Sequence, residues 1–404
     1  MKPFSFVHVA DTHLGYEQYN LAVRREDFAR AFQETVEKTL ELKPDFMILA
    51  GDLFHQARPS NKTLEHTIRS FCRLREAGIP VLVVDGSHDA APNMITGTIL
   101  NPLDSAGLIY YLPRHENACW ENESCYVYGI PNFRTRRRTE RQLPIFYDVK
   151  KPMPRGDKFN IFVFHMALDI PELMRGKPAD FAEASPDYIP EGFDYYAGGH
   201  IHEPWQLPFK GSILVYSGST ETVSYEDAEV DKGFYYVEVN SKKEVEINRI
   251  RLTSPRRFKI LECNFTGYPP RRITEEAIEI VRENDEPGVI LIPVLKGTLP
   301  AEASRREINV RRIREAAEKA LLVRPIVLMR EESLPPEVIQ SIFESSIKSL
   351  KMRAFKYFSE FFSKRYRKEE AEKLAHLAVD LIQPLIKGDE EGVRNLLERI
   401  LDED

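Results

Sequence analysis

Cysteine is too scarce in this chain for a disulfide-stapled scaffold, with four residues in 404. No two cysteines have the C-x-x-C spacing of zinc and redox sites, although Cys119 and Cys125 are close enough in sequence to pair. We therefore expect four reduced cysteines that serve as packing residues in a cytoplasmic protein.

Long apolar runs and a strong excess of one charge are also missing. No run approaches the roughly 18–20 apolar residues that span a bilayer. The segment 1–4 leads straight into a strand-like pattern, so we expect neither a membrane span nor a signal peptide. A net charge of −7 excludes a nucleic-acid binder that is basic over its whole surface, but it allows a local basic cleft. Hydrophobic residues make up 42% of the chain, which is typical of globular proteins.

Short apolar runs alternate with helical patterns over residues 1–253. The runs are nearly continuous, as strands buried on both faces are, and helical patterns such as 25–42 and 63–77 lie between them. This alternation predicts an α/β layer fold. The predicted strands are 4–10, 46–50, 81–84, 161–164, 195–198 and 213–216.

A boundary is predicted at Thr253-Ser254-Pro255. The following segments 258–265, 273–283, 289–295, 308–322 and 326–329 read strand, helix, strand, helix, strand. From Pro335 onward the pattern is helical, with breaks expected near Pro384 and Gly388. The sequence therefore predicts an α/β domain over 1–253, a small α/β domain over 254–333 and a helical region over 334–404.

Potential metal ligands follow several of the predicted strands. They are Asp11 and His13, Asp52, Ser87 with His88 and Asp89, His165, and His200 with His202. Residues two apart near a strand end point the same way, and the carboxyl ends of strands in open α/β sheets form the ligand crevice. Mixed carboxylate and imidazole ligands suit manganese, iron or zinc. So many ligands exceed the needs of one catalytic ion, whereas two ions that share a carboxylate would use them all.

The order of the motifs D-x-H, G-D, G-x-H-D, H and G-H-x-H resembles the calcineurin-like metallophosphoesterase superfamily. Within it, HVADTHLGYEQYNLAVRREDFARAF, ILAGDLFHQARPSNKTL and YYAGGHIHEPW are similar to the archaeal meiotic-recombination-eleven nucleases, relatives of bacterial SbcD. The resemblance implies a metallophosphoesterase β-sandwich flanked by helices, a capping domain that recognises DNA, and a C-terminal helical region. It also implies manganese-dependent 3′-to-5′ exonuclease and single-strand endonuclease activity in the processing of DNA double-strand breaks.

The resemblance implies a role for each residue of the site. One Mn²⁺ would be held by Asp11, His13, Asp52 and His202, and the second by Asp52 as a bridge, Ser87, His165 and His200. His88 would assist the transition state without binding metal, and Asp89 could orient it. His55 would contact a ligand rather than an ion.

Position 87 departs from the superfamily, which usually has an asparagine there whose carbonyl oxygen binds the second metal. Serine is shorter and its hydroxyl is a poorer ligand. Either water fills the gap, or the second ion binds weakly, or the residue has been altered to weaken activity. Two alternatives therefore stay open: a catalytically weakened scaffold that binds DNA ends, and another metallophosphoesterase, such as a nucleotide phosphodiesterase or a phosphatase.

Three surfaces are candidates for partners. A basic run is either a solvated loop or a DNA-phosphate contact; it comprises Arg134, Arg136, Arg137, Arg138 and Arg141. In the resembled family, helices after the second and third strands form a homodimer interface, which here would include Leu64, Ile68 and Leu100. The apolar stripe of the helical tail would bind the coiled coil of an ABC-type ATPase subunit; it comprises Phe343, Ile347, Leu350, Ala354, Phe358, Phe361, Leu374, Ala378, Leu381 and Leu385.

Overall fold

The computed structural model describes residues 1–91, 97–178, 180–300, 303–331, 351–364, 366–387, 389, 392–394 and 396–397. They form two compact units. The first contains Met1–Asn264, Arg271–Lys296 and Ile308–Leu328, and the second contains the described residues of Phe265–Pro270, Gly297–Glu307 and Met329–Asp404. The domain boundaries inferred from the sequence, at 253/254 and 333/334, stay predictions.

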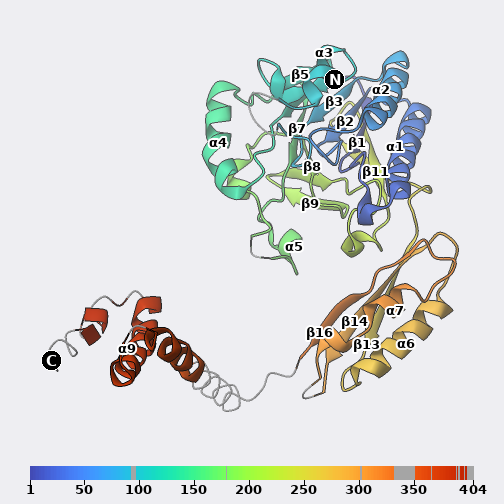
Figure 1. Cartoon of the computed structure of the whole chain (residues 1–404). Coiled ribbons are helices and arrows are strands. Elements are labelled where there is room, and N and C mark those ends of the chain that lie inside the picture. The colour runs from blue at the N-terminus through green and yellow to red at the C-terminus, as the bar shows by residue number, and fades with distance from the viewer. Residues whose placement is uncertain are drawn as a thin grey trace. The chain divides into compact units, whose positions relative to one another are not determined.

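Two six-stranded mixed sheets form the core of the first unit (Figure 1). The first sheet has the order β12-β11-β1-β2-β3-β4, with β1 to β4 parallel and β11 and β12 antiparallel to their neighbours. Its strands are β1 (Phe4–Val9), β2 (Phe46–Ala50), β3 (Val81–Val84), β4 (Tyr110–Tyr111), β11 (Gly233–Val239) and β12 (Val245–Arg251).

The second sheet has the order β5-β6-β7-β8-β10-β9, in which β6, β7, β8 and β10 are parallel. Its strands are β5 (Cys119–Glu121), β6 (Cys125–Gly129), β7 (Phe159–His165), β8 (Tyr195–Gly199), β9 (Trp205–Phe209) and β10 (Ser212–Tyr216). All six predicted strands of this region are confirmed, whereas β4, β5, β6, β9, β11 and β12 were not predicted.

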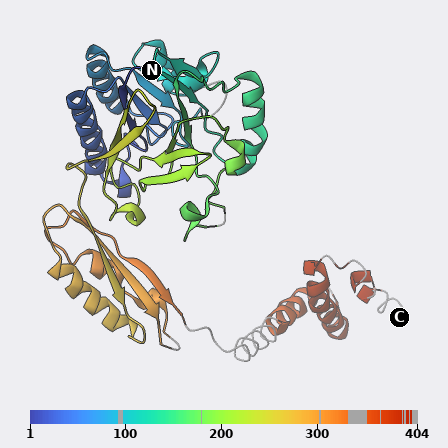
Figure 2. The same ribbon diagram turned by 180° about the vertical axis from the view of Figure 1, so that it is seen from behind.

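Helices lie outside the sheets, so the central strands are buried on both faces (Figures 1 and 2). Along β1, Phe6 packs between the two sheets and Val7 packs in the cluster on the helical side, which includes Phe32 and Phe71. This explains the continuous apolar runs and confirms the α/β sandwich. The helices are α1 (Ala22–Leu42), α2 (Asn61–Glu76), α3 (Leu100–Ser105), α4 (Arg136–Val149) and α5 (Pro171–Met174). Single 3₁₀ turns occur at Gln18–Asn20, Leu112–Arg114, Pro186–Tyr188, Tyr225–Asp227 and Arg305–Glu307.

A third sheet has the order β13-β14-β15, with β16 also paired to β14. It contains β13 (Phe258–Asn264), β14 (Ile290–Thr298), β15 (Leu322–Val323) and β16 (Ile326–Arg330), with helices α6 (Pro270–Glu283) and α7 (Val310–Arg314). The helix predicted over 308–322 is present but shorter, because α7 ends at Arg314. The Asp285 carboxylate accepts the backbone N–H groups of Glu318, Lys319 and Ala320, which turns the chain into β15.

Part of the C-terminal region is described, and it is helical over 351–362 and in α9 (Lys368–Lys387). The break predicted near Pro384 is wrong, because α9 continues through this proline. Phe343, Ile347 and Leu350 of the predicted stripe, together with Pro335 and Gly388, lie outside the described residues. No helix in the part of the chain that the structure describes could cross a membrane. All four cysteines are free, as expected.

A buried ionic network joins separate segments of the first unit. The fully buried Arg24 guanidinium donates to Gln18 Oε1 at 2.9 Å, Asp27 Oδ2 at 2.7 Å and Glu221 Oε1 at 3.1 Å. It also donates to the Thr222 carbonyl at 2.9 Å. These contacts hold the loop after β1 and the loop before β11 against α1, and both loops border the site described below.

We predict that Arg24→Met destabilises the protein by about 3–5 kcal/mol, because it leaves the buried Glu221 carboxylate without a cationic partner. Asp27 keeps its ion pairs with Arg30 and Arg256. Urea unfolding measures the change. The control is Arg25→Met, since Arg25 is 30% exposed and its ion pair with Glu17 should contribute about 1 kcal/mol or less. Equal effects of the two substitutions would show that the network contributes no special stability.

Candidate metal centre

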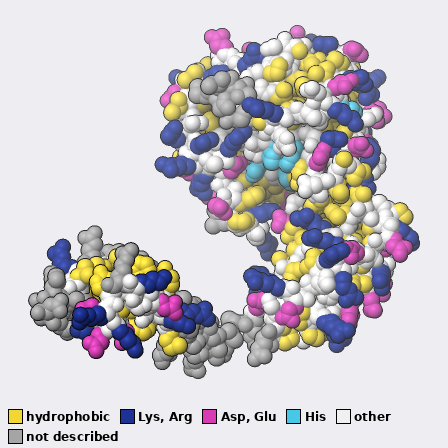
Figure 3. Space-filling model, in the orientation of Figure 1, with side chains coloured by type: hydrophobic (Ala, Val, Ile, Leu, Met, Phe, Trp, Pro, Cys, Tyr) yellow, Lys and Arg dark blue, Asp and Glu magenta, His cyan; other side chains and the backbone are white. Residues whose placement is uncertain are grey.

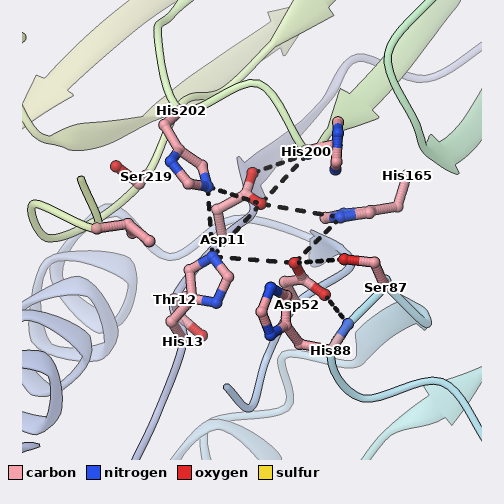
Figure 4. Close-up of polar contacts among 12 residues, drawn as sticks. Asp11, Thr12, His13, Asp52, Ser87, His88, His165, His200, His202 and Ser219 are labelled. Atoms are coloured by element: carbon pink, nitrogen blue, oxygen red, sulfur yellow. Dashed lines mark hydrogen bonds and ion pairs between the residues drawn. The ribbon is translucent and has the colours of Figure 1, made fainter. Parts of the chain in front are cut away.

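The predicted ligands come from the carboxyl ends of strands in both sheets (Figure 4). Asp11 and His13 follow β1, and Asp52 follows β2. His165 ends β7, and His202 follows β8 in the second sheet. Histidine side chains gather in a hollow on the face of the molecule shown in Figure 3. The carboxyl ends of strands from two packed sheets therefore supply one site.

Four of the predicted site residues have a left-handed backbone conformation. Asp11, His13, Asp52 and His200 all have positive φ, at 54°, 42°, 50° and 90°. Non-glycine residues adopt this left-handed conformation at a cost, and such residues cluster at functional sites. The ligands therefore do not continue the extended strand, as the sequence argument assumed, but lie in sharp turns just after it. Gly51 allows one such turn, with φ 87° and the His165 ring where a Cβ atom would be.

Two groups of ligand atoms that include carboxylates have the spacing of metal sites. Asp11, His13 and His202 form one group, and Asp11, Asp52 and His165 form another, with every pair of ligand atoms in a group within 4.8 Å. A third group with this spacing, His13, His55 and His88, contains no carboxylate. His13 Nε2 is 3.9 Å from Asp11 Oδ1 and 3.8 Å from Asp52 Oδ2. The structure thus brings together five of the predicted ligands, and both aspartates lie where two ions could share a carboxylate.

The chemistry of these donors fits divalent metal. Asp11 and Asp52 are 0% and 2% exposed, so two like charges are buried side by side. His165 Nε2 is buried without a hydrogen bond, and its nearest acceptor is Asp52 Oδ2 at 3.3 Å. Burial opposes the charged imidazole, but the Asp52 and Asp11 carboxylates outweigh it and raise the pKa of His165 to about 10. The carboxylates therefore attract a cation, and an orphaned imidazole nitrogen faces them.

Hydrogen bonds on the far side of the rings fix two of these imidazoles. His202 Nδ1 is 3.0 Å from Asp227 Oδ2, and His165 Nδ1 is 2.8 Å from the Ala50 carbonyl. Each contact places the proton on Nδ1 and leaves Nε2 free to bind metal. Asp227 is itself held by the backbone N–H of Ser224 and by Lys232. The sequence reasoning missed Asp227, because it lies 25 residues from His202 in a loop without a motif.

His88 and His55 lie beside the metal groups. His88 Nδ1 is 2.9 Å from the His55 carbonyl, and the two rings stack with centroids 4.6 Å apart. Tyr16, which the sequence did not suggest, covers the other face of His55 at 3.7 Å. His55 Nδ1 is 3.4 Å from Nδ1 of the ligand His13. His55 thus contacts a ligand and stacks on His88.

The role suggested for Asp89 needs correction. Its carboxylate accepts the backbone N–H groups of Gly86 at 2.7 Å and Phe54 at 3.2 Å, while Nδ1 of His88 faces the His55 carbonyl instead. Burial raises the pKa of Asp89 to about 7. Asp89 therefore holds the loop that carries His88 and does not orient its ring.

Ser87 and His200 contribute less directly than the other predicted ligands. Ser87 Oγ is 3.5 Å from Asp52 Oδ2, at the limit of a hydrogen bond. His200 belongs to neither metal group; its backbone N–H donates to Asp11, and its Nε2 is 3.7 Å from Glu183 Oε2. His200 and His202 therefore do not aim at one point.

The basic run is not a solvated loop. It opens α4, with Arg137, Arg138 and Arg141 exposed and Arg136 paired with Asp169 at 3.2 Å. Arg134, just before the helix, donates to the Ala90 carbonyl at 2.7 Å and so supports the loop that carries His88. DNA contact by this run stays a prediction.

Two of the three residues predicted for a dimer interface have exposed surface. Leu64 and Ile68 are half-buried on α2, whereas Leu100 is 0% exposed and packs in the chain's own core. A residue without exposed surface offers nothing to a second copy, so the predicted homodimer now depends on Leu64 and Ile68.

The fold and the site define a class, and sequence comparison agrees with it. Residues 4–204 match the family described as Calcineurin-like phosphoesterase, so the chain is a metallophosphoesterase. The DNA double-strand break repair protein Mre11 of Archaeoglobus fulgidus is 30% identical over 388 residues, which cover 88% of this chain and 78% of that protein. The chain belongs to the Mre11 family.

Other relatives carry the same name. The Mre11 protein of Methanococcus maripaludis is 26% identical, with 86% of this chain and 91% of that protein covered. That of Methanocaldococcus jannaschii is 33% identical, with 58% and 62% covered. Among solved structures, purple acid phosphatase PPD1 of yellow lupin has a TM-score of 0.39 and 13% identity, with 62% of this chain and 52% of that one covered. This last likeness is too low to support an argument.

We predict that Asp227→Asn weakens metal binding about 10- to 100-fold, because the carboxylate that orients His202 is lost. Isothermal titration with Mn²⁺ measures the affinity. The control is Asp231→Asn, since Asp231 is 60% exposed and pairs with Arg251 away from the ligands. An unchanged affinity for Asp227→Asn would mean that His202 is held without this carboxylate.

Proposed function

We propose that the chain is a manganese-dependent DNA nuclease, with 3′-to-5′ exonuclease and single-strand endonuclease activity, that processes DNA double-strand breaks. The observation that carries the proposal is the group of two carboxylates and three imidazoles at strand ends of both sheets, in which all but His202 are buried. Family membership adds the substrate, because the relatives are named DNA double-strand break repair proteins. Mixed oxygen and nitrogen donors favour manganese over calcium.

The residues would divide between two ions. Asp11, His13, Asp52 and His202 would hold one, and Asp52, His165 and His200 would help to hold the other. Two divalent ions in these positions would lower the pKa of a water nucleophile and neutralise charge on a phosphodiester. The shared Asp52 is fixed for this purpose, since its Oδ1 accepts the backbone N–H of His88 at 2.9 Å.

His88 would act directly on the substrate. Its Nδ1–H is committed to the His55 carbonyl, so in the imidazolium form Nε2–H can donate to a phosphoryl or leaving oxygen. The stack of Tyr16, His55 and His88 limits rotation of the ring. A positioned donor of this kind contributes about 10²- to 10⁴-fold in rate.

The test is digestion of end-labelled duplex and single-stranded DNA with Mn²⁺, with Mg²⁺ or with chelator. We expect cleavage with Mn²⁺ and none with chelator. DNA that is bound but left intact would favour the scaffold alternative. Hydrolysis of nucleotide or phosphoprotein esters without DNA cleavage would favour another metallophosphoesterase.

We predict that His88→Ala lowers the nuclease rate about 10²- to 10⁴-fold, while isothermal titration still shows the Mn²⁺ binding of the unaltered chain. His376→Ala is the control, because His376 is an exposed residue of α9. Loss of metal together with activity in His88→Ala would make His88 a ligand.

We further propose that the helical tail binds the coiled coil of an ABC-type ATPase subunit. Large apolar side chains of the described tail are exposed, including Tyr357 at 64%, Phe361 at 49% and Leu385 at 63%. An amphipathic surface of this kind fits a partner helix. Deletion from residue 335 onward should abolish co-purification with the ATPase and leave Mn²⁺-dependent exonuclease activity. Retention of the complex at full affinity would place the partner site elsewhere.

A further inference from the structure

Glu183 is a partly buried residue beside the candidate metal site, and no role has yet been given to its carboxylate. Its backbone N–H donates to the Ala167 carbonyl at 2.8 Å, and Ala184 forms a parallel bridge with Leu168. This short pairing follows directly after the end of β7, where His165 lies. The fold therefore holds Glu183 next to the ligands, although 18 residues separate it from His165 in sequence.

Among the described residues, the Glu183 carboxylate has no lysine or arginine partner. Its side chain is 12% exposed, and its Oε2 accepts only a long contact from the Ala167 N–H at 3.4 Å. Within the described ranges, no lysine or arginine nitrogen lies within 4.0 Å of it, whereas Asp227, whose side chain is 6% exposed, has Lys232. A buried carboxylate is costly unless it is paired or coordinates a metal.

Distances at the site fall into two classes. Contacts that orient a histidine are hydrogen bonds of 2.8–3.0 Å, such as those to Ala50, Asp227 and the His55 carbonyl. Contacts between predicted ligands are longer, at 3.3–3.9 Å. The distance from Glu183 Oε2 to His200 Nε2 is 3.7 Å, which belongs to the second class. Two donors that share one ion, each about 2.1 Å from it, lie within about 4.2 Å of each other.

The second ion needs such a donor in this chain. His165 and Asp52 would bind this ion, since His165 Nε2 is 3.3 Å from Asp52 Oδ2. Ser87 offers only a neutral hydroxyl, with its Oγ 3.5 Å from Asp52 Oδ2. We propose that Glu183 is a protein ligand of the second metal ion, together with His200, and takes the place of the side-chain ligand that Ser87 does not provide. The inference rests on the proposed two-metal function.

The test is titration of the intact chain with Mn²⁺ by calorimetry, with electron paramagnetic resonance to detect spin-coupled ion pairs. Glu183→Gln keeps the size of the side chain and its acceptor for the Ala167 N–H, but it removes the charge. We expect the affinity of the second ion to fall at least about tenfold and the coupled signal to be lost, with the first ion unaffected. Ser87→Asn in the same chain should restore both.

Glu172→Gln is the matched control, because Glu172 is exposed on α5. Two ions bound with unchanged affinity in Glu183→Gln would overturn the proposal, as would an equal loss of both ions, which would indicate a structural role. Failure of Ser87→Asn to restore binding would show that the two positions do not replace each other. Binding of fewer than two ions by the unaltered chain would overturn the proposed function itself.

Discussion

Burial of two carboxylates side by side is the constraint on which the rest of this structure depends. Asp11 and Asp52 follow neighbouring parallel strands and have almost no exposed surface. Such a pair is stable only if positive charge lies close to it. In the two groups that contain these carboxylates, the first sheet supplies one imidazole, that of His13. The second sheet brings His165 and His202 to the same point, so the packing of the two sheets and the chemistry of the site depend on each other.

The surroundings of the site fix the direction of each ligand. Ala50 and Asp227 set the protonated nitrogens of His165 and His202, so that the free nitrogens face the carboxylates. Left-handed turns at Asp11 and Asp52 place the side chains at the strand ends, at a cost in backbone conformation. The sheet hydrogen bonds and the buried ionic network around Arg24 offset that cost. A rigid arrangement of this kind suits a site that must hold ions at fixed separation.

The sequence predicted what depends on local pattern. Strands buried on both faces leave continuous apolar runs, and potential ligands stand out at their ends. The fold could therefore be predicted, as could most of the side chains that the structure brings together at the candidate site. The sequence-based predictions failed where tertiary contacts determine the end of a helix or the partner of a side chain. Asp285 ended a predicted helix after Arg314, the basic run began α4, and the partner of His88 proved to be a backbone carbonyl. Asp227 and Glu183 carry no motif, because only the folded chain brings them to the histidines.

Anomalous diffraction at the manganese edge, from crystals of the intact chain grown with Mn²⁺, would show how many ions the site holds. A two-metal centre should give two peaks about 3.5–4 Å apart, one on either side of the Asp52 carboxylate, with His13 and His202 on one peak and His165 on the other. A single peak, or peaks away from Asp52, would contradict a two-metal centre.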